Sequence, residues 1–293
     1  MSYAFAVVGS GPSAAIDAAR RVIVSADANS ESTFTHTDSP TDANVTVVVT
    51  TVDQTDTDIH PVSAGVTSPD STVVLVEFGG IGGCPIDEID AAVTTLPAEG
   101  PTFETLQTRV MTTTSPGDGM FADQISITAG ALAGQRAVAM CDASDVDIAG
   151  TVLEISGTEI GPERELIEIP DVYTDTDQIT EQLIPDRTSR DLDLEVSLSH
   201  AERAVDDRLG IITQVGERES FPAPYYIAQV ASTESISDAR ATEFAAGVDA
   251  DWNSAYMKAL GEALERYCAG VYRTEMFTTA PEETQSAAVS PRR

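Results

Sequence analysis

The sequence predicts an α/β fold for residues 1–165 and a smaller α+β segment after it. Two observations carry this prediction. The first is a strand, a glycine turn and a helix in succession over residues 3–24. The second is a pair of short runs rich in β-branched residues, at 45–52 and 73–78, of the kind that parallel sheets bury on both faces. An apolar content of 42% favours a folded core over an acidic disordered chain.

The remaining elements of the first segment follow from apolar periodicity and turn residues. We predict helices over residues 86–96, 105–111 and 122–140, and short strands over 151–155 and 165–169. Strands that alternate with helices in this way are typical of an α/β domain. Acidic, turn-rich residues from 166 to 190 are interpreted as a linker between two domains.

The second segment, residues 191–293, is expected to contain a helix, two strands and a long final helix, over 194–205, 210–215, 224–231 and 254–272. The long helix carries the strongest local signal in the chain. At 100° per residue its apolar side chains fall on one stripe, which predicts a buried face. That stripe consists of Tyr256, Leu260, Ala263, Leu264, Tyr267 and Val271.

Two glutamates, Glu262 and Glu265, lie three residues apart on the opposite side of this helix, with Lys258 beside them. Clustered carboxylate oxygens are the ligands that Mg²⁺ prefers, and through Mg²⁺ they can hold nucleotide phosphates. The alternative is a solvated helix face on which Glu262 pairs with Lys258 or Arg266 at a spacing of four. The residues alone leave both interpretations open.

The charge composition indicates the salt conditions in which the protein works and the partners that it disfavours. Acidic residues outnumber basic ones 48 to 16, the formal net charge is −32, and Lys258 is the only lysine. At about 1 M salt the screening length falls to roughly 3 Å, so neighbouring carboxylates hardly repel one another. We therefore expect a halophilic protein, and the scarcity of basic residues disfavours nucleic-acid binding.

Location and cysteine use point to a reducing, high-salt cytoplasm. The N-terminus has no positively charged region or cleavage site of a signal peptide, and no apolar stretch approaches the roughly 20 residues that span a bilayer. Cys84, Cys141 and Cys268 lack CxxC spacing, which argues against a disulfide framework and a structural zinc site. We expect all three to be buried as small apolar residues.

Two glycine turns are weak candidates for anion binding. Gly9-x-Gly11-x-x-Ala14 follows a strand and opens a helix, as in dinucleotide-binding turns, but Asp53 is only a loose candidate for the acidic partner. A turn that simply lets strand and helix pack is the favoured interpretation. The run at residues 79–83 has no following Lys, so a tight strand crossover is favoured there over a phosphate loop.

Several segments of the second part resemble the YcaO family of peptide-modifying enzymes. Residues 204–212 (AVDDRLGII) resemble the opening segment of the family domain, and 220–226 (SFPAPYY) resemble the strand that follows it. Residues 246–249 (AGVD) resemble a glycine-bearing turn before the glutamate helix, and the helix resembles the first acidic motif. The resemblance covers roughly residues 190–280 and implies that Glu262 and Glu265 bind Mg²⁺ and nucleotide phosphate, with Arg266 in support.

The first 150 residues resemble the ThiF-like, Rossmann-type half-domain that accompanies YcaO proteins in SagD-type bacteriocin cyclodehydratase systems. Residues 7–16, 74–90 and 100–110 carry this resemblance. The family often has a CxxC zinc motif where this chain has Thr102 and Thr105. Threonine cannot supply thiolate ligands, so no zinc is expected.

The resemblance implies ATP-dependent modification of a precursor peptide, in which a Cys, Ser or Thr side chain attacks a backbone amide and an azoline ring forms; relatives make thioamides or amidines. The family domain extends through a second acidic motif and a proline-rich tail beyond the helix found here, so the implied active site is expected to be incomplete. A truncated product, a split enzyme with a complementing subunit, a homodimer and a non-catalytic scaffold that binds a precursor peptide or partner remain as alternatives.

We expect the fold to depend on high salt, because a net charge of −32 repels itself when screening is weak. Thermal melts followed by circular dichroism, in about 2 M KCl and about 0.1 M KCl, measure this dependence. The transition should shift to lower temperature or disappear at low salt. An unchanged transition would contradict the expectation.

Overall fold

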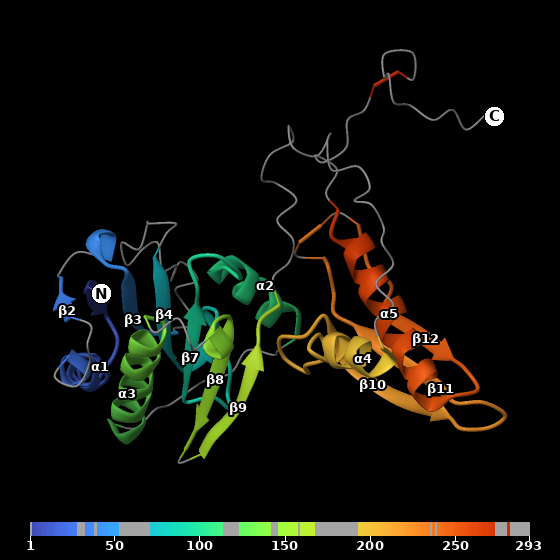
Figure 1. Ribbon diagram of the computed structural model, residues 1–293, viewed down its shortest axis with the longest axis horizontal. Helices are drawn as coiled ribbons and strands as arrows, with labels where there is room; N and C mark the ends of the chain where they lie inside the picture. Colours follow the sequence, from blue (N-terminus) through green and yellow to red (C-terminus); the bar gives the residue numbers. More distant parts are fainter. Residues whose placement is uncertain are drawn as a thin grey trace.

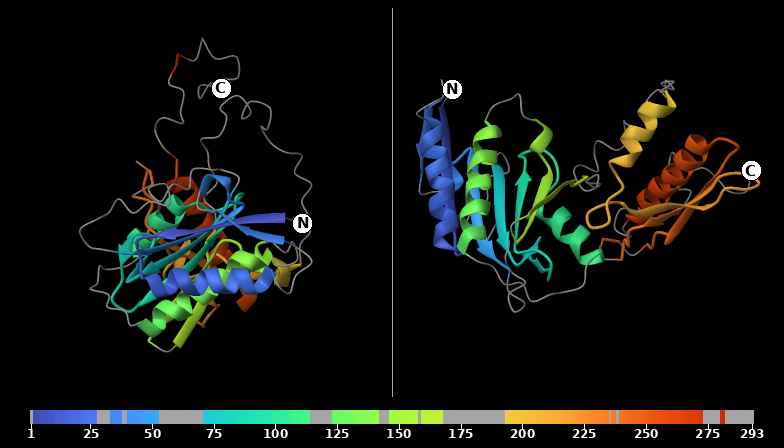
Figure 2. Two further views of the ribbon diagram at one scale, coloured as in Figure 1. Left: turned by 90° about the vertical axis from the view of Figure 1, so that its left-hand side faces the viewer. Right: turned by 90° about the horizontal axis from the view of Figure 1, so that it is seen from below.

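The computed structural model describes residues 2–27, 33–37, 40–52, 71–113, 123–141, 146–157, 159–167, 193–234, 236–237, 239–272 and 280–281. These residues form a seven-stranded sheet with helices on both faces and a three-stranded sheet with helices on one face (Figures 1 and 2). We call them the large-sheet unit, β1 to β9, and the small-sheet unit, α4 to α5. Among the described residues, no helix is both long enough and apolar enough to cross a bilayer.

The large sheet is mixed, with the strand order β2-β1-β3-β4-β7-β8-β9. Its first four strands are parallel to one another and its last three run antiparallel to their neighbours. The predicted buried parallel strands are therefore confirmed as β3 and β4. In chain order the seven strands are β1 (Ser2–Gly9), β2 (Thr33–His36), β3 (Val45–Thr51), β4 (Thr72–Phe78), β7 (Ala91–Leu96), β8 (Thr151–Ser156) and β9 (Glu159–Glu165).

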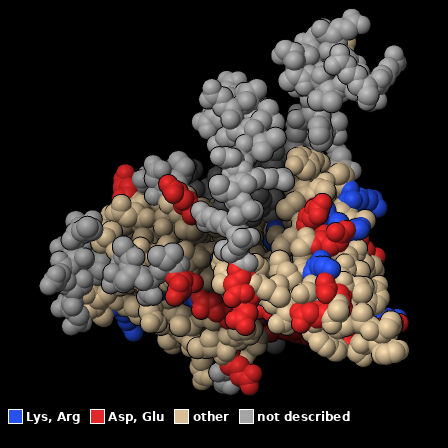
Figure 3. Space-filling view, turned by 45° about the vertical axis from the view of Figure 1, so that its right-hand side comes forward, with Lys and Arg blue, Asp and Glu red and all other residues tan. Residues whose placement is uncertain are grey.

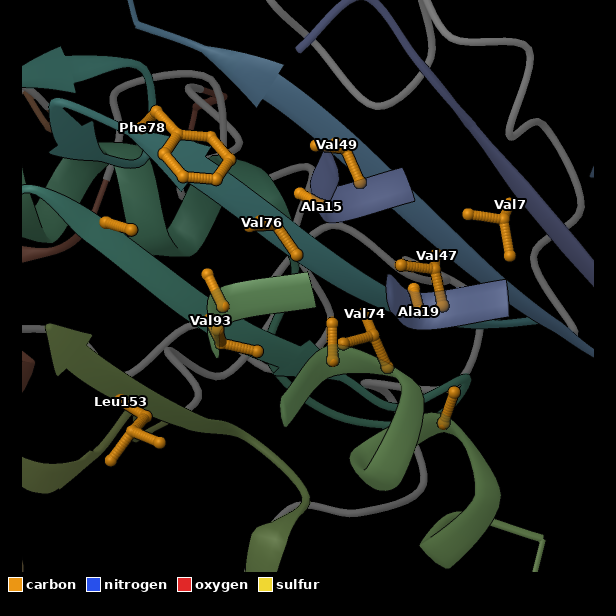
Figure 4. Packing of buried hydrophobic residues seen from close by; sticks show 14 of the residues in the cluster. Val7, Ala15, Ala19, Val47, Val49, Val74, Val76, Phe78, Val93 and Leu153 are labelled. Carbon is orange, nitrogen blue, oxygen red and sulfur yellow. The ribbon is translucent and has the colours of Figure 1, made fainter. Parts of the chain in front are cut away.

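Each face of the large sheet has its own core because successive strand residues point to opposite faces. Val47 and Val49 face α1 (Ser13–Asp27) and α3 (Asp123–Ala139), which pack against each other through small residues such as Ala15 and Ala133 (Figure 4). Val48 faces the other layer. That layer contains α2 (Phe103–Thr113) and the short strands β5 (Gly80–Ile81) and β6 (Cys84–Pro85). Two 3₁₀ turns, Pro40–Asp42 and Val146–Ile148, precede β3 and β8 in the chain.

Two predicted elements of this unit are wrong. Residues 86–96 were expected to be helical, but Ala91–Leu96 is a strand between β4 and β8 with all six residues buried. A strand buried on both faces has no alternation, so periodicity does not distinguish it from a buried helix. The strand expected at 165–169 is displaced: β9 spans Glu159–Glu165, because β8 and β9 form an antiparallel pair that turns back near Gly157. Residues 166–167 are not in a strand, and residues 168–169 lie outside the described residues.

The small-sheet unit places one long helix across a three-stranded antiparallel sheet. Its elements are α4 (Leu194–Glu202), β10 (Ile212–Glu219), β11 (Tyr225–Val230), β12 (Phe244–Val248) and α5 (Trp252–Gly270). The side chain of Asp251 caps α5 by accepting a hydrogen bond from the Ser254 N–H at 2.9 Å. The predicted buried stripe is confirmed at Leu260, Ala263 and Tyr267, while Tyr256 and Leu264 are only partly buried.

Residues 246–249 were expected to form a turn, but residues 246–248 belong to the edge strand β12. Gly247 is required here for a reason of space. A Cβ atom on Gly247 would lie 2.1 Å from the carbonyl oxygen of Ala255, so only glycine lets β12 pass directly beneath the first turns of α5.

Ion pairs join the two units beside β9. Arg164 on β9 contacts Glu154 at 2.7 Å through Nε, and its Nη1 lies 2.8 Å from Asp206 and 2.5 Å from Asp207. Arg208 reaches back to the same Glu154 carboxylate at 2.8 Å. The AVDDRLGII segment therefore attaches the small-sheet unit to the large sheet.

Apolar and aromatic contacts reinforce this attachment. Leu209 is 1% exposed and belongs to the core cluster between α2 and the large sheet. Arg109 of α2 is 1% exposed and donates a hydrogen bond from Nη1 to the hydroxyl of Tyr267 on α5 at 2.6 Å. Its guanidinium carbon also lies 4.6 Å from the centre of the Tyr267 ring, within the range of a cation–π contact. The helix that carries Glu262 is thus fixed by the other unit.

Removing the Tyr267 hydroxyl takes an acceptor from a buried guanidinium, so Tyr267→Phe should lower the free energy of unfolding by about 1–3 kcal/mol. Urea titration at constant high salt measures the change. Tyr225→Phe, on partly buried β11, serves as the control and should change stability by much less. Equal effects of the two variants would show that the inter-unit hydrogen bond adds little.

Candidate functional site

The outer face of α5 carries the predicted site residues. Arg266 donates from Nε to Glu262 Oε1 at 2.7 Å and from Nη1 to the Thr242 hydroxyl at 3.0 Å, just before β12 begins. Glu262 and Arg266 are each 40% exposed. Glu265 is exposed. The structure therefore forms one of the two ion pairs that the spacing allowed, Glu262 with Arg266.

Lys258 does not join the glutamates. Its Nζ donates to Asp249 Oδ2 at 2.5 Å and to the carbonyl oxygen of Val248 at 3.3 Å. The hydrogen bond from Lys258 holds the pKa of Asp249 below its usual value. Lys258, Glu262 and Arg266, at intervals of four, thus form a row above the outer edge of β12, tied to the strand at both ends.

This face supplies two carboxylates and one guanidinium. Within the described part of the chain, no three Cys, His, Asp or Glu side chains gather closely enough to hold a metal ion. Mg²⁺ requires near-octahedral oxygen coordination and is usually held by one or two carboxylates together with water and substrate phosphates. Two carboxylates such as those of Glu262 and Glu265 could supply only part of such a set.

The glycine turn after β1 serves packing. The Gly11 N–H donates to the carbonyl oxygen of Val49 at 3.1 Å. Gly9 has φ 136°, and a Cβ atom there would lie 1.8 Å from the same oxygen. The closeness of β3 explains both glycines without a ligand, in line with the favoured interpretation. Asp53 lies outside the described residues.

The glycine run after β4 binds a carboxylate of the protein itself, that of Glu77. The N–H groups of Gly82 and Gly83 each donate to a different carboxylate oxygen of Glu77 at 2.7 Å. Glu77 is 0% exposed. Desolvation by burial raises its pKa to about 7, against the lowering effect of the two backbone hydrogen bonds. Sequence reasoning missed Glu77, although a single acidic residue inside the apolar run TVVLVEF was a signal.

Thr102 and Thr105, which stand where a CxxC motif was considered, form a helix cap. The hydroxyl of Thr102 accepts a hydrogen bond from the Thr105 N–H at 3.2 Å, and the two hydroxyl oxygens are 3.1 Å apart. Since α2 begins at Phe103, Thr102 is its N-cap residue. The pair stabilises the first turn of α2.

The cysteines are less buried than predicted. Cys84 and Cys141 are partly buried, and burial raises the pKa of each thiol to about 11. Cys268 is exposed, so the expectation that it is buried is wrong. The reason is its position on α5, where the residue directly after buried Tyr267 points away from the sheet.

A cavity of about 970 Å³ lies where the two units meet. Its lining includes Glu99, Asp147 and Glu165 from the large-sheet unit, and His200 of α4 with Arg203 directly after that helix. Arg203 is ion-paired with Glu165 across the cavity wall. Figure 3 shows the wider setting, a surface on which acidic side chains gather in groups and basic ones are fewer.

The chain is similar to known proteins in structure but not in sequence. No protein-family profile matches the chain, and no curated protein matches it in sequence. Among solved structures, it is similar to a heterocyclase in complex with substrate and cofactor, with a TM-score of 0.56 and 13% sequence identity over 91% of this chain. The chain has a heterocyclase-like fold.

The match covers 39% of that heterocyclase, so this chain spans well under half of its length. The structure of the heterocyclase TruD is also similar, with a TM-score of 0.45 and 14% identity, over 73% of this chain and 34% of that one.

The buried acid predicts a pH-dependent stability. The pKa of Glu77 in the folded protein is about 7, above its ordinary value of 4.5. The free energy that protonated Glu77 contributes to folding is therefore fully present below pH 4.5 and is lost as the pH rises through 7. The full loss is on the order of 3 kcal/mol. Urea titrations of Glu77→Gln between pH 5 and pH 8 should therefore show a smaller fall in stability than the wild type shows. Exposed Glu104→Gln is the control, and a Glu77→Gln profile parallel to the wild type would contradict the assignment.

Proposed function

We propose that this chain is the ThiF-like domain and the first part of a YcaO domain of a SagD-type cyclodehydratase. In this proposal residues 1–165 and 191–293 are the two domains, and 166–190 connect them. The chain works in a high-salt cytoplasm on a precursor peptide. The support is a heterocyclase-like fold over 91% of the chain, together with two carboxylates on the outer face of α5.

The proposed reaction forms an azoline from a Cys, Ser or Thr residue. The side-chain nucleophile adds to the carbonyl carbon of the preceding amide, and the former carbonyl oxygen leaves after it has been activated. ATP with Mg²⁺, when bound, would supply that activation by transferring its γ-phosphoryl group to this oxygen, with ADP as the leaving group. The amide oxygen departs as phosphate, so the peptide loses one water and no oxidant is needed.

The roles of the chain's own residues follow from their positions. Glu262 and Glu265 would hold the cation, and Arg266 would exchange its contact with Glu262 for one with phosphate oxygens. Two carboxylates leave most of an octahedral shell to water, phosphate or other protein groups. We therefore propose that activity requires a complementing subunit or a second copy.

A non-catalytic scaffold is the second candidate, and one observation favours it. The Glu262 carboxylate is already neutralised by Arg266 at 2.7 Å, as on an ordinary solvated helix face. A scaffold would bind a precursor peptide or a partner subunit and need no nucleotide. The two candidates differ in what glutamine substitution does.

Co-expression with a polypeptide that carries the remainder of a YcaO domain tests the proposal. The isolated chain should not hydrolyse ATP, whereas the pair should do so when a precursor peptide is present, with loss of one water from the peptide by mass spectrometry. Glu262→Gln and Glu265→Gln keep side-chain volume and remove a ligand charge, so each should lower the rate by about 10²-fold or more.

Glu195→Gln, an exposed acidic residue on α4, is the matched control and should leave the rate unchanged. Circular dichroism establishes that each variant is folded. Hydrolysis by the isolated chain, or full activity in both α5 variants, would remove the basis for the assigned site and favour the scaffold.

A further inference from the structure

No strand of the described chain pairs with the outer edge of β12, because β12 is the last strand of the order β10-β11-β12. The hydrogen bonds from Val230 N to Glu243 O, at 2.8 Å, and from Asp249 N to Pro224 O fix the register with β11. Odd-numbered residues therefore point their backbone groups toward β11. The N–H and C=O groups of Phe244, Ala246 and Val248 point outward. The Val248 carbonyl oxygen already accepts a hydrogen bond from Lys258 Nζ at 3.3 Å, so within the described chain the open part of the edge consists of the Phe244 and Ala246 groups and the Val248 N–H.

The same three residues place their side chains on the sheet face opposite α5. Phe244 is 52% exposed and Val248 is 51% exposed. A groove of about 410 Å³ lies beside Phe244, with Ile227 and Gln229 of β11 in its wall. Apolar side chains gathered beside an open strand edge are typical of a binding surface.

On the α5 side of this edge the basic side chains are paired with carboxylates, and the remaining exposed charges are negative. Lys258 and Arg266 are already bound to Asp249 and Glu262. Glu265 is exposed beside this row, as is Glu243 at the start of β12. A partner that binds the edge from this side would therefore be complementary if it carries positive charge.

We propose that the edge of β12 binds an extended basic peptide segment as an added strand. Successive side chains of a strand point to opposite faces, so one set would lie against Phe244 and Val248 and the other beside Glu262 and Glu265. The segment that fits alternates apolar and basic residues. The proposal does not rest on the proposed function, since strand addition requires neither nucleotide nor catalysis.

Fluorescence anisotropy with a labelled peptide of about ten residues, in which Lys and Val alternate, tests the proposal. A peptide of the same composition in two blocks, Lys then Val, is the reference. The titration uses the full chain at the lowest salt that keeps it folded. The alternating peptide should bind at least about ten-fold more tightly than the block peptide.

Ala246→Pro removes an outward N–H and places a proline ring at the edge, a substitution that edge strands tolerate. It should weaken binding of the alternating peptide by about ten-fold or more. If this variant is unfolded by circular dichroism, Phe244→Asp gives the same test through the apolar face. Val24→Asp, at a residue 66% exposed on α1, is the control and should bind as the wild type does.

Equal binding of the two peptides would overturn the proposal, as would wild-type affinity in the folded edge variants. Light scattering provides the remaining check. A wild-type dimer that Ala246→Pro converts to a monomer would assign the edge to a second copy of this chain and would also overturn it.

Discussion

The attachment of the small-sheet unit to the large sheet depends on the Arg164 guanidinium. Burial alone would lower the pKa of Arg164, but the hydrogen bond to Asp207 and the charges of Glu154 and Asp206 raise it above its usual value. Arg164 in turn holds the pKa of Asp207 below the usual range. Removing one partner of such a cluster leaves an uncompensated charge, at a cost of about 3–5 kcal/mol. The position of α5, and of everything on its outer face, follows from this cluster and from Arg109.

The chain uses its scarce cations at this junction. Arg109, Arg164, Arg203 and Arg208 each bridge the two units, although basic residues number 16 against 48 acidic ones. Concentrated salt screens exposed carboxylates within about 3 Å, whereas it screens a pair such as Arg164 and Glu154, 11% and 9% exposed, much less. High salt therefore relieves repulsion at the surface without removing the internal attractions that hold the units together.

The sequence was sufficient where apolar periodicity was complete. It predicted the parallel strands β1, β3 and β4, though not β2, together with α1, α3 and the buried face of α5, whose apolar residues recur at regular intervals. It failed for β7, which is buried on both faces, and for β12, whose Gly247 was interpreted as a turn residue when it is a point of close approach to α5. At the candidate site, spacing limited the partners of Glu262 to two but did not choose between them. That choice depends on β12, because Asp249 takes Lys258 and leaves Arg266 to the glutamate.

The loop after β4 has a consequence for how glycine-rich segments are interpreted in other sequences. Its two glycine N–H groups are saturated by an internal carboxylate that lies five and six residues earlier in the chain. A phosphate could enter only by displacing Glu77 from a site to which it is covalently tethered, and a tethered competitor acts at a high effective concentration. An acidic residue at that spacing before a glycine run is thus a mark of self-occupancy. It distinguishes a loop that has its own counter-anion from one that awaits a nucleotide.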